Sequence, residues 1–178
     1  MAIFLSAGHH LKDTGAIGIS GRQENQETIK LRDAILNFIK PTYKVITDND
    51  SETLAQYLNR IKPGNGSVVL ELHFDAYNQK ASGTTGLYKD GANNLSIQFA
   101  NELTEKVSTL LNIPNRGGKS ESQSNRGKLG LTRKDGITVL LELCFIDNGI
   151  DMQTYDIHFM DLAKLIANLL MKYDDLII

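Results

Sequence analysis

Short apolar runs, bounded by polar or turn-forming residues, recur along the chain, and each predicts a buried strand. The run at 67–73 contains three consecutive branched residues, a pattern typical of a strand that is covered on both faces. The predicted strands span residues 3–6, 43–47, 67–73, 86–88, 129–132 and 138–144.

Between most of these runs, apolar residues recur three or four positions apart, which predicts amphipathic helices. Pro41 ends the first helix and Pro63 the second, for which Asn49 and Glu52 have the spacing of a capping box. The predicted helices span about 24–40, 54–61, 95–110 and 162–173. Strands that alternate with helices predict an α/β fold: one layered domain over 1–178, with a mostly parallel central sheet of about five or six strands and helices on both faces.

The segment 112–128 breaks this alternation. It is polar, basic and rich in glycine and serine, so we expect an exposed, mobile loop there.

Composition narrows the class of protein. With 178 residues, of which 41% are hydrophobic, the chain can bury the core of one domain. A net charge of -2 favours neither nucleic acid nor an anionic membrane as partner. No stretch is long and apolar enough to span a membrane, and the first residues lack the basic region of a signal peptide. Cys144 is the one cysteine, so no internal disulfide can form, and we expect an inert buried thiol.

Candidate catalytic residues fall where an open α/β sheet places its active site, at the carboxyl ends of strands. His9 follows the first predicted strand, His73 ends the third, and Glu142 lies in the last. Glu24, at the start of the first helix, can fold back to the same edge. Two imidazoles and a carboxylate are the ligands of many catalytic zinc sites.

Each of these residues also has a purely structural interpretation. A single histidine at a strand end is more often hydrogen-bonded than metal-bound, and a glutamate at a helix start is stabilised by the helix dipole alone. Glu142 differs, because it lies within the apolar run VLLELCF. A carboxylate in a buried strand is costly, and its presence there indicates a function.

Four segments resemble, in order, the motifs of the zinc-dependent N-acetylmuramoyl-L-alanine amidases of the third amidase family. The segments are AGHHLKDTGAIG, the GRQE that ends at Glu24, LELHFDA and VLLELCFIDN, and their order and spacing cover nearly the whole chain. The resemblance implies one zinc ion per chain bound by His9, Glu24 and His73, with Glu142 as the catalytic carboxylate. His10 stands where the family usually has glycine, so either histidine of this loop is a candidate ligand; we favour His9.

The resemblance leaves the surrounding residues less defined. Glu71 replaces a residue that is often small and polar, and it shares a strand face with His73, so we expect it to hydrogen-bond a metal ligand. Asn78, Arg116 and Arg126 border the expected crevice, and we expect them to contact the substrate. A merely solvated basic loop is an equally open interpretation.

The implied reaction is hydrolysis of the amide bond between N-acetylmuramic acid and L-alanine in peptidoglycan, the activity of a cell-wall-degrading, antimicrobial lysin. Two alternatives are a zinc peptidase that cuts the stem peptide and a non-catalytic peptidoglycan-binding module. We expect a monomer that is made in the cytoplasm without a signal peptide. It would reach the cell wall by a holin-dependent route after lysis or by an injection apparatus.

Overall fold

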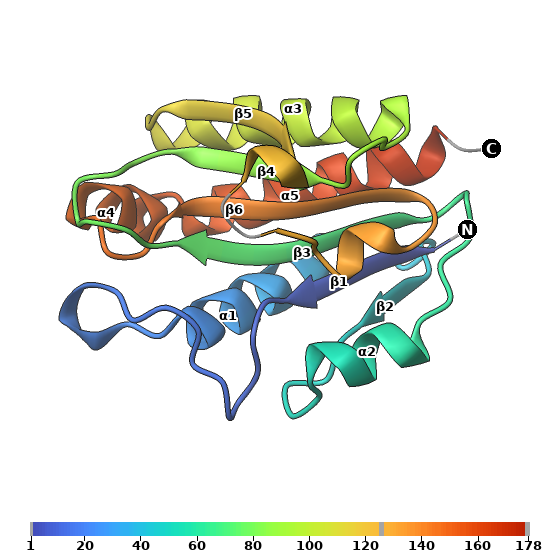
Figure 1. The fold of residues 1–178 in the computed structure, drawn as a ribbon, viewed down its shortest axis with the longest axis horizontal. Helices are drawn as coiled ribbons and strands as arrows, with labels where there is room; N and C mark the ends of the chain where they lie inside the picture. The colour runs from blue at the N-terminus through green and yellow to red at the C-terminus, as the bar shows by residue number, and fades with distance from the viewer. Residues whose placement is uncertain (1, 125–126, 177–178) are drawn as a thin grey trace.

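The computed structural model describes residues 2–124 and 127–176, whose strands form one mixed sheet in the order β2-β1-β3-β6-β4-β5 (Figure 1). Strands β1, β2, β3 and β6 are parallel, β4 runs antiparallel to β6, and the edge strand β5 runs parallel to β4. The predicted mostly parallel sheet is confirmed. The strands are β1 (Ile3–Ala7), β2 (Val45–Thr47), β3 (Val68–Asp75), β4 (Thr84–Tyr88), β5 (Asn115–Ser120) and β6 (Ile137–Phe145).

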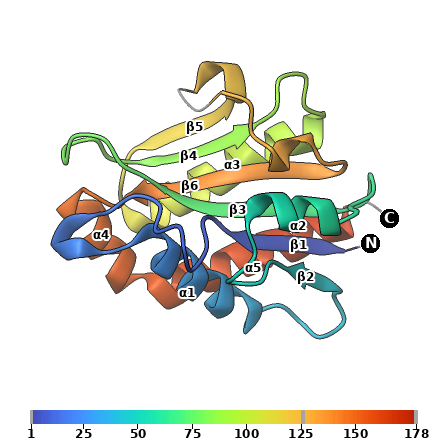
Figure 2. The same ribbon diagram turned by 60° about the horizontal axis from the view of Figure 1, so that its bottom comes forward.

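Helices cover the two faces of the sheet unequally (Figures 1 and 2). On one face, α1, α3 and α5 enclose the main apolar core, and α2 packs over a smaller cluster on the other. The predicted covering of both faces is therefore confirmed. Within the described part of the chain, no helix is long and apolar enough to cross a membrane. The helices are α1 (Glu24–Leu36), α2 (Leu54–Arg60), α3 (Asn94–Leu111), α4 (Gly149–Ile157) and α5 (Phe159–Asp175).

Alternation along β3 separates the core from the functional face. Leu70, Leu72 and Phe74 belong to the main core, whereas Glu71 and His73 line a cavity on the α2 side of the sheet. Because side chains in a strand point to alternate faces, this is the separation that the sequence predicts.

The register between β3 and β6 shifts just beyond the pair formed by His73 and Glu142. In this irregular stretch both Leu143 and Cys144 are fully buried in the main core, although neighbours in a regular strand would face opposite sides. Burial raises the pKa of the Cys144 thiol well above its usual value, so the thiolate is disfavoured. This supports the predicted inert thiol.

The prediction of a loop across 112–128 is wrong for Asn115–Ser120, which form β5. An edge strand keeps much of its surface exposed, so it lacks the apolar alternation by which strands are recognised. Gly118 permits close packing on α3, since a Cβ there would lie 2.7 Å from the Asn101 Oδ1. A strand without side chains at two positions is hard to recognise by pattern.

The last apolar run before β6 is also not the strand that its pattern predicts. Leu131–Arg133 form a 3₁₀ turn, and Leu131 is buried against the same small cluster as Phe4 and Val69. A short apolar run has no period of its own, so helix, turn and strand can all bury it.

The capping box of α2 lies four residues later than predicted. Thr53 accepts a hydrogen bond from the Gln56 N–H, and the Gln56 side chain accepts one from the Thr53 N–H. Glu52 instead accepts from the Asn49 N–H at 3.1 Å and closes the preceding turn. Helix α4, which no prediction covered, starts at the Asn148 cap.

Candidate metal centre

His9, Glu24 and His73 meet at the carboxyl edge of the sheet, although 64 positions of sequence separate the first from the last. One possible ligand atom from each lies within 4.8 Å of the other two. Glu24 and His73 are buried, and His9 is half-buried. His9 lies in the loop after β1, Glu24 is the first residue of α1, and His73 lies near the end of β3. Three separate elements therefore build the cluster.

His9 owes its position to an unusual backbone. Its φ is 68°, in the left-handed region that few residues other than glycine adopt. This conformation turns the chain sharply where β1 ends. Gly8 is required beside it, because a Cβ on Gly8 would collide with the imidazole of His73. Backbone strain of this kind, about 1–3 kcal/mol, is typical of functional sites.

Glu24 is held by the backbone on both sides as well as by the two imidazoles. Its Oε2 accepts a hydrogen bond from the Ala16 N–H at 2.9 Å, and its Oε1 accepts one from the Phe74 N–H at 3.0 Å. The same two oxygens lie 3.1 Å from the His9 Nε2 and 2.9 Å from the His73 Nδ1. The carboxylate therefore has little freedom to move away from the imidazoles.

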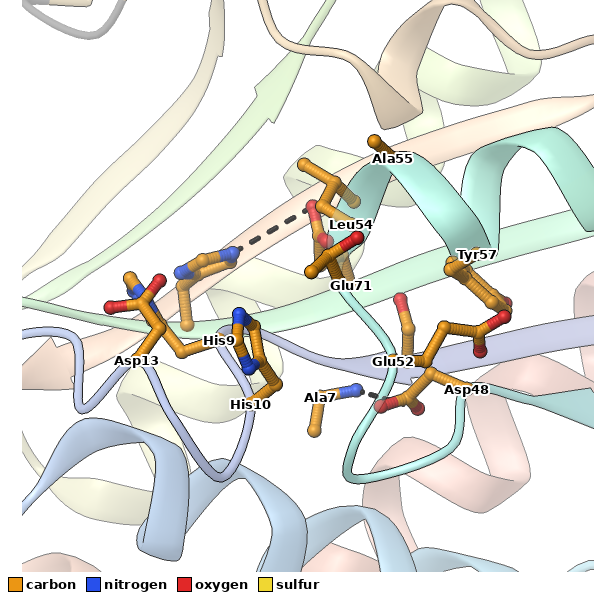
Figure 3. A pocket seen from close by; sticks show the side chains of 13 residues that line it. Ala7, His9, His10, Asp13, Asp48, Glu52, Leu54, Ala55, Tyr57 and Glu71 are labelled. Atoms are coloured by element: carbon orange, nitrogen blue, oxygen red, sulfur yellow. Dashed lines mark hydrogen bonds and ion pairs between the residues drawn. The ribbon is translucent and has the colours of Figure 1, made fainter.

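A carboxylate lies behind each imidazole. The His9 Nδ1 lies 2.9 Å from the Asp13 Oδ2, and the His73 Nε2 lies 3.7 Å from the Glu71 Oε2, the contact dashed in Figure 3. Pairs of this kind fix the ring orientation and the tautomer of metal-bound histidines. The sequence pointed to Glu71 for this position but assigned no such contact to Asp13.

Proton affinities in the cluster are strongly perturbed. Burial alone would lower the pKa of His73, but Glu24 and Glu71 raise it to about 10. Burial would likewise raise the pKa of Glu24, and the hydrogen bonds from His73 and His9 hold it well below its usual range. The pKa of His9 is raised, since Glu24 and Asp13 outweigh the effect of its burial. Without a metal ion, Glu24 therefore favours the protonated form of both imidazoles.

The donor set fits zinc. Ligands placed tetrahedrally at 2.0–2.1 Å from zinc lie about 3.3–3.4 Å apart. The two Glu24 carboxylate oxygens lie 2.9 Å from the His73 Nδ1 and 3.1 Å from the His9 Nε2, close to this spacing. Two nitrogens and one oxygen leave a fourth position for water or substrate, as in catalytic zinc sites.

Glu142 lies beside this cluster on the neighbouring strand. It pairs with His73 in the register of β3 and β6, and with Thr85 in that of β4 and β6. It is 2% exposed, and its charge contributes to the raised pKa of His73. A cavity of about 160 Å³ opens over Glu142, and Arg116 and Lys119 of β5 line it.

The remaining predicted residues have more varied positions. His10 is not part of the ligand cluster; its backbone and ring shape the loop through bonds with Asp13 and Lys12. Asn78 closes its own loop, where its Oδ1 accepts from the N–H groups of residues 80 and 81. Arg126 lies outside the described residues. Lys119, which no prediction named, shares the cavity of Arg116; only the location of β5 could have revealed it.

The chain resembles known proteins over nearly its whole length. A family model described as N-acetylmuramoyl-L-alanine amidase matches residues 3–172. No curated protein matches the chain.

Solved structures share the fold. An N-acetylmuramoyl-L-alanine amidase from Clostridium difficile 630 is similar with a TM-score of 0.81 and 17% identity, over 98% of this chain and 96% of that one. The catalytic domain of the CD27L endolysin targeting Clostridia difficile has a TM-score of 0.75 and 24% identity, over 97% of each chain. The catalytic domain of CwlV from Bacillus (Paenibacillus) polymyxa var. colistinus has a TM-score of 0.71 and 22% identity, over 98% of this chain and 99% of that one.

Proposed function

Because this chain belongs to the N-acetylmuramoyl-L-alanine amidase family, we propose that His9, Glu24 and His73 bind its zinc ion and that Glu142 is its catalytic carboxylate. The activity of the family is hydrolysis of the amide bond between N-acetylmuramic acid and L-alanine, so the substrate is cell-wall peptidoglycan. The observation that carries the assignment is the grouping of three zinc-type donors beside a buried carboxylate on one face of the sheet.

Zinc bound there would supply a Lewis acid that polarises the scissile carbonyl and would lower the pKa of a bound water to about 7. As ligands, His9 and His73 would be neutral, and each would turn its other ring nitrogen toward a carboxylate. The His9 Nδ1 lies 2.9 Å from Asp13, and the His73 Nε2 lies 3.7 Å from Glu71. Glu24 supplies the anionic ligand, which the N–H groups of Ala16 and Phe74 keep in place.

Glu142 moves the protons of the reaction. It accepts a proton from the attacking water as the new C–O bond forms at the lactyl carbonyl. It returns that proton to the nitrogen of L-alanine as the C–N bond breaks, which leaves a carboxylic acid on the sugar and an amine on the peptide. The remaining acid proton then passes to the amine, so the products are a carboxylate and an ammonium group. Because Glu142 is 2% exposed, few other waters compete for this proton.

Arg116 and Lys119 are suited to hold the peptide side of the substrate. Both line the cavity over Glu142, and stem peptides carry carboxylates that these cations can bind. The Arg116 guanidinium also stacks over the Phe145 ring at 5.2 Å, which restricts its motion. Asn78 and Arg126 stay predictions for the same role.

Three expectations stay predictions: one catalytic domain over 1–178, a monomeric state, and delivery after lysis or by injection. The family match spans nearly the whole of that range, which supports the single domain.

The identity of the cleaved bond is tested by digestion of purified peptidoglycan, with fragment analysis and labelling of new amines and reducing ends. We expect new N-terminal alanine without new reducing ends, lost on chelation and restored by zinc. New amines on another residue would indicate the stem-peptide peptidase instead. No cleavage of several wall types would favour the binding module.

A further inference from the structure

The segment between β6 and α4 holds the loop 76–83, which joins β3 to β4 beside α4 (Figure 1). Asp147 accepts hydrogen bonds from the N–H groups of residues 77 and 79, at 3.1 and 2.9 Å, and Asn148 donates one to the Ala81 carbonyl at 2.9 Å. Asn148 also caps α4, because its Oδ1 accepts from the N–H groups of residues 150 and 151. The start of α4 and the loop are therefore fixed to each other at several points.

Asp151, in the first turn of α4, is the most buried of the residues that hold this loop, with an exposed fraction of 0%. Its Oδ1 accepts a hydrogen bond from the Ser82 hydroxyl. Its Oδ2 accepts from the N–H groups of Gly83 at 3.1 Å and Phe145 at 3.0 Å. None of these three donors belongs to α4, which Asn148 already caps. A buried carboxylate is costly unless donors satisfy it, and these donors direct the action of Asp151 to the loop and to β6.

Arg116 lies against the same three residues. The Ser82 carbonyl accepts a hydrogen bond from the Arg116 Nη1 at 3.4 Å, and the Arg116 Cζ lies 5.2 Å from the centre of the Phe145 ring. A Cβ on Gly83 would lie 3.0 Å from the Arg116 Cγ, so the bare backbone there leaves room for the arginine stem. Each residue that donates to the Asp151 carboxylate therefore also forms part of the bed on which Arg116 lies.

The charge of Arg116 is oriented without being neutralised. Its guanidinium rests on a carbonyl and a ring, and no carboxylate of the described residues forms an ion pair with it. It lines the cavity of about 160 Å³ over Glu142. A guanidinium that is held in place can bind a carboxylate through two parallel N–H bonds, and it loses little conformational freedom when it does so.

We propose that Asp151 is a positioning residue for substrate binding. Through Ser82, Gly83 and Phe145 it fixes Arg116 where the guanidinium meets a carboxylate of the stem peptide. This inference rests on the proposed function, which assigns the peptide side of the substrate to Arg116. Among the described residues, Asp151 belongs neither to the metal cluster nor to the lining of the cavity over Glu142. Its loss should therefore weaken substrate binding and spare the chemical step.

The test measures KM and kcat for hydrolysis of a soluble muramyl pentapeptide by zinc-loaded wild type, Asp151→Ala, Arg116→Ala and the double variant. We expect each single variant to raise KM about tenfold, and Asp151→Ala to keep kcat within about twofold. In the Arg116→Ala background, Asp151→Ala should change KM less than twofold, because the group that it positions is gone. Effects on KM that multiply, a fall in kcat at unchanged KM, or a wild-type KM in Arg116→Ala would overturn the proposal.

A second substrate identifies the group that Arg116 meets. When the stem carboxylates of the same peptide are amidated, wild type and Asp151→Ala should have KM values within about twofold of each other. A tenfold difference that persists on the amidated peptide would overturn the proposal, since the lost contact would then not be to a carboxylate.

Two further variants separate positioning from a general loss of stability. Asp151→Asn keeps an oxygen for the two N–H groups, and its amide can donate to the Ser82 hydroxyl, so KM should recover to within about threefold of wild type. Asn93→Ala removes the cap of α3, which also bonds the Gly136 carbonyl at the opposite end of β6. It should lower stability and keep the wild-type KM. A KM in Asn93→Ala as high as that of Asp151→Ala would overturn the proposal.

Ser82→Ala keeps the inference testable if Asp151→Ala does not fold. It removes one of the three donors to Asp151 and should raise KM about threefold at wild-type kcat. An unchanged KM in this variant would count against the proposal. Failure of the wild-type protein to release alanine amines would instead overturn the proposed function.

Discussion

Single residues in the metal centre couple proton binding to metal binding. His73 and His9 hold their protons more tightly in the folded protein than in the unfolded chain, because Glu24 lies between them. Zinc competes for the same nitrogen atoms, and a metal-bound imidazole must be neutral. The charge state of two side chains therefore decides how tightly the site takes up metal at a given pH.

This coupling predicts a pH dependence of the free energy of unfolding. The pKa of His73 is raised from 6.5 to about 10, so its stabilising contribution is complete below pH 6.5 and is lost as the pH rises toward 10. We expect the free energy of unfolding of metal-free protein to fall over this window, with a slope that corresponds to about one proton released on unfolding. Denaturant unfolding at a series of pH values measures it. Zinc-loaded protein should show no such loss, and zinc affinity should rise with pH. A metal-free stability that stays level from pH 6.5 to 10 would contradict the assigned ion pair.

The candidate ligands and Glu142 could be indicated from sequence by their positions at strand ends and in a buried strand, and by the resemblance of four segments to the family motifs. A carboxylate inside VLLELCF and a histidine at a strand end are costly unless they are used. The partner residues could not be recognised in the same way. Asp13 lies in an exposed loop, where an aspartate is ordinary, and only the folded loop brings its carboxylate to 2.9 Å from the His9 Nδ1.

Among the elements, the loop between β1 and α1 is the most constrained by the site. Gly15 has a φ of 63°, and a Cβ there would lie 2.5 Å from the His9 Cδ2 and 2.6 Å from the Glu24 Oε2. The loop thus packs its backbone directly against two zinc ligands. Gly15 permits the left-handed turn, and its lack of a side chain leaves room for the two proposed ligands.

Gly15→Ala should therefore impair the metal site more than the fold. We expect zinc affinity to fall by tenfold or more, and the free energy of unfolding of the metal-free protein to fall by about 1–2 kcal/mol from left-handed strain. Gly91→Ala is the matched control, because Gly91 has a φ of 69° and a Cβ there would meet nothing within 4 Å. It should lose similar stability in unfolding experiments and keep its zinc affinity. Equal zinc affinity in the two variants would argue against the packing described for Gly15.

Elements with strong apolar periodicity were predictable, and those with weak signals were not. α3 and α5 carry long apolar stripes and lie close to their predicted ranges. β5 is polar and contains two adjacent glycines, so pairing with β4 and packing on α3 decide its conformation. The 3₁₀ turn at Leu131–Arg133 is likewise decided by the sheet surface that it covers.

At the scale of the whole molecule, zinc bound at the proposed site would connect three elements that are separate in sequence. The three proposed ligands come from β3, from α1 and from the loop after β1. A ligand that binds only the folded state stabilises it by an amount that grows with its concentration. The metal centre should therefore also support the fold.

Thermal unfolding can measure this support. At a free zinc concentration of a thousand times Kd, stabilisation is about 4 kcal/mol, which for a domain of this size raises Tm by roughly 8–16 °C. Chelation should reverse the shift. Glu24→Gln should show a much smaller one, since the anionic ligand is lost. An equal zinc-dependent shift in that variant would place the metal elsewhere.

The order of the strands was beyond sequence reasoning, because periodicity identifies a strand but not its neighbour. β6, last in sequence, lies between β3 and β4, and this insertion brings Glu142 beside His73. The alternation of strands and helices predicted a layered, mostly parallel sheet. The antiparallel pair of β4 and β6 follows from tertiary packing and has no signature in either strand.

The most direct test of the proposed metal centre is a zinc titration of metal-free protein in which bound metal and amidase activity are measured together, for the wild type and for Glu142→Gln. We expect both to bind one zinc ion per chain with affinities within about threefold. Wild-type activity should rise in proportion to bound zinc, and the variant should be about 10²–10⁴-fold slower when equally loaded. Activity of the loaded variant within tenfold of the wild type, or wild-type activity that does not follow bound zinc, would contradict the assignment.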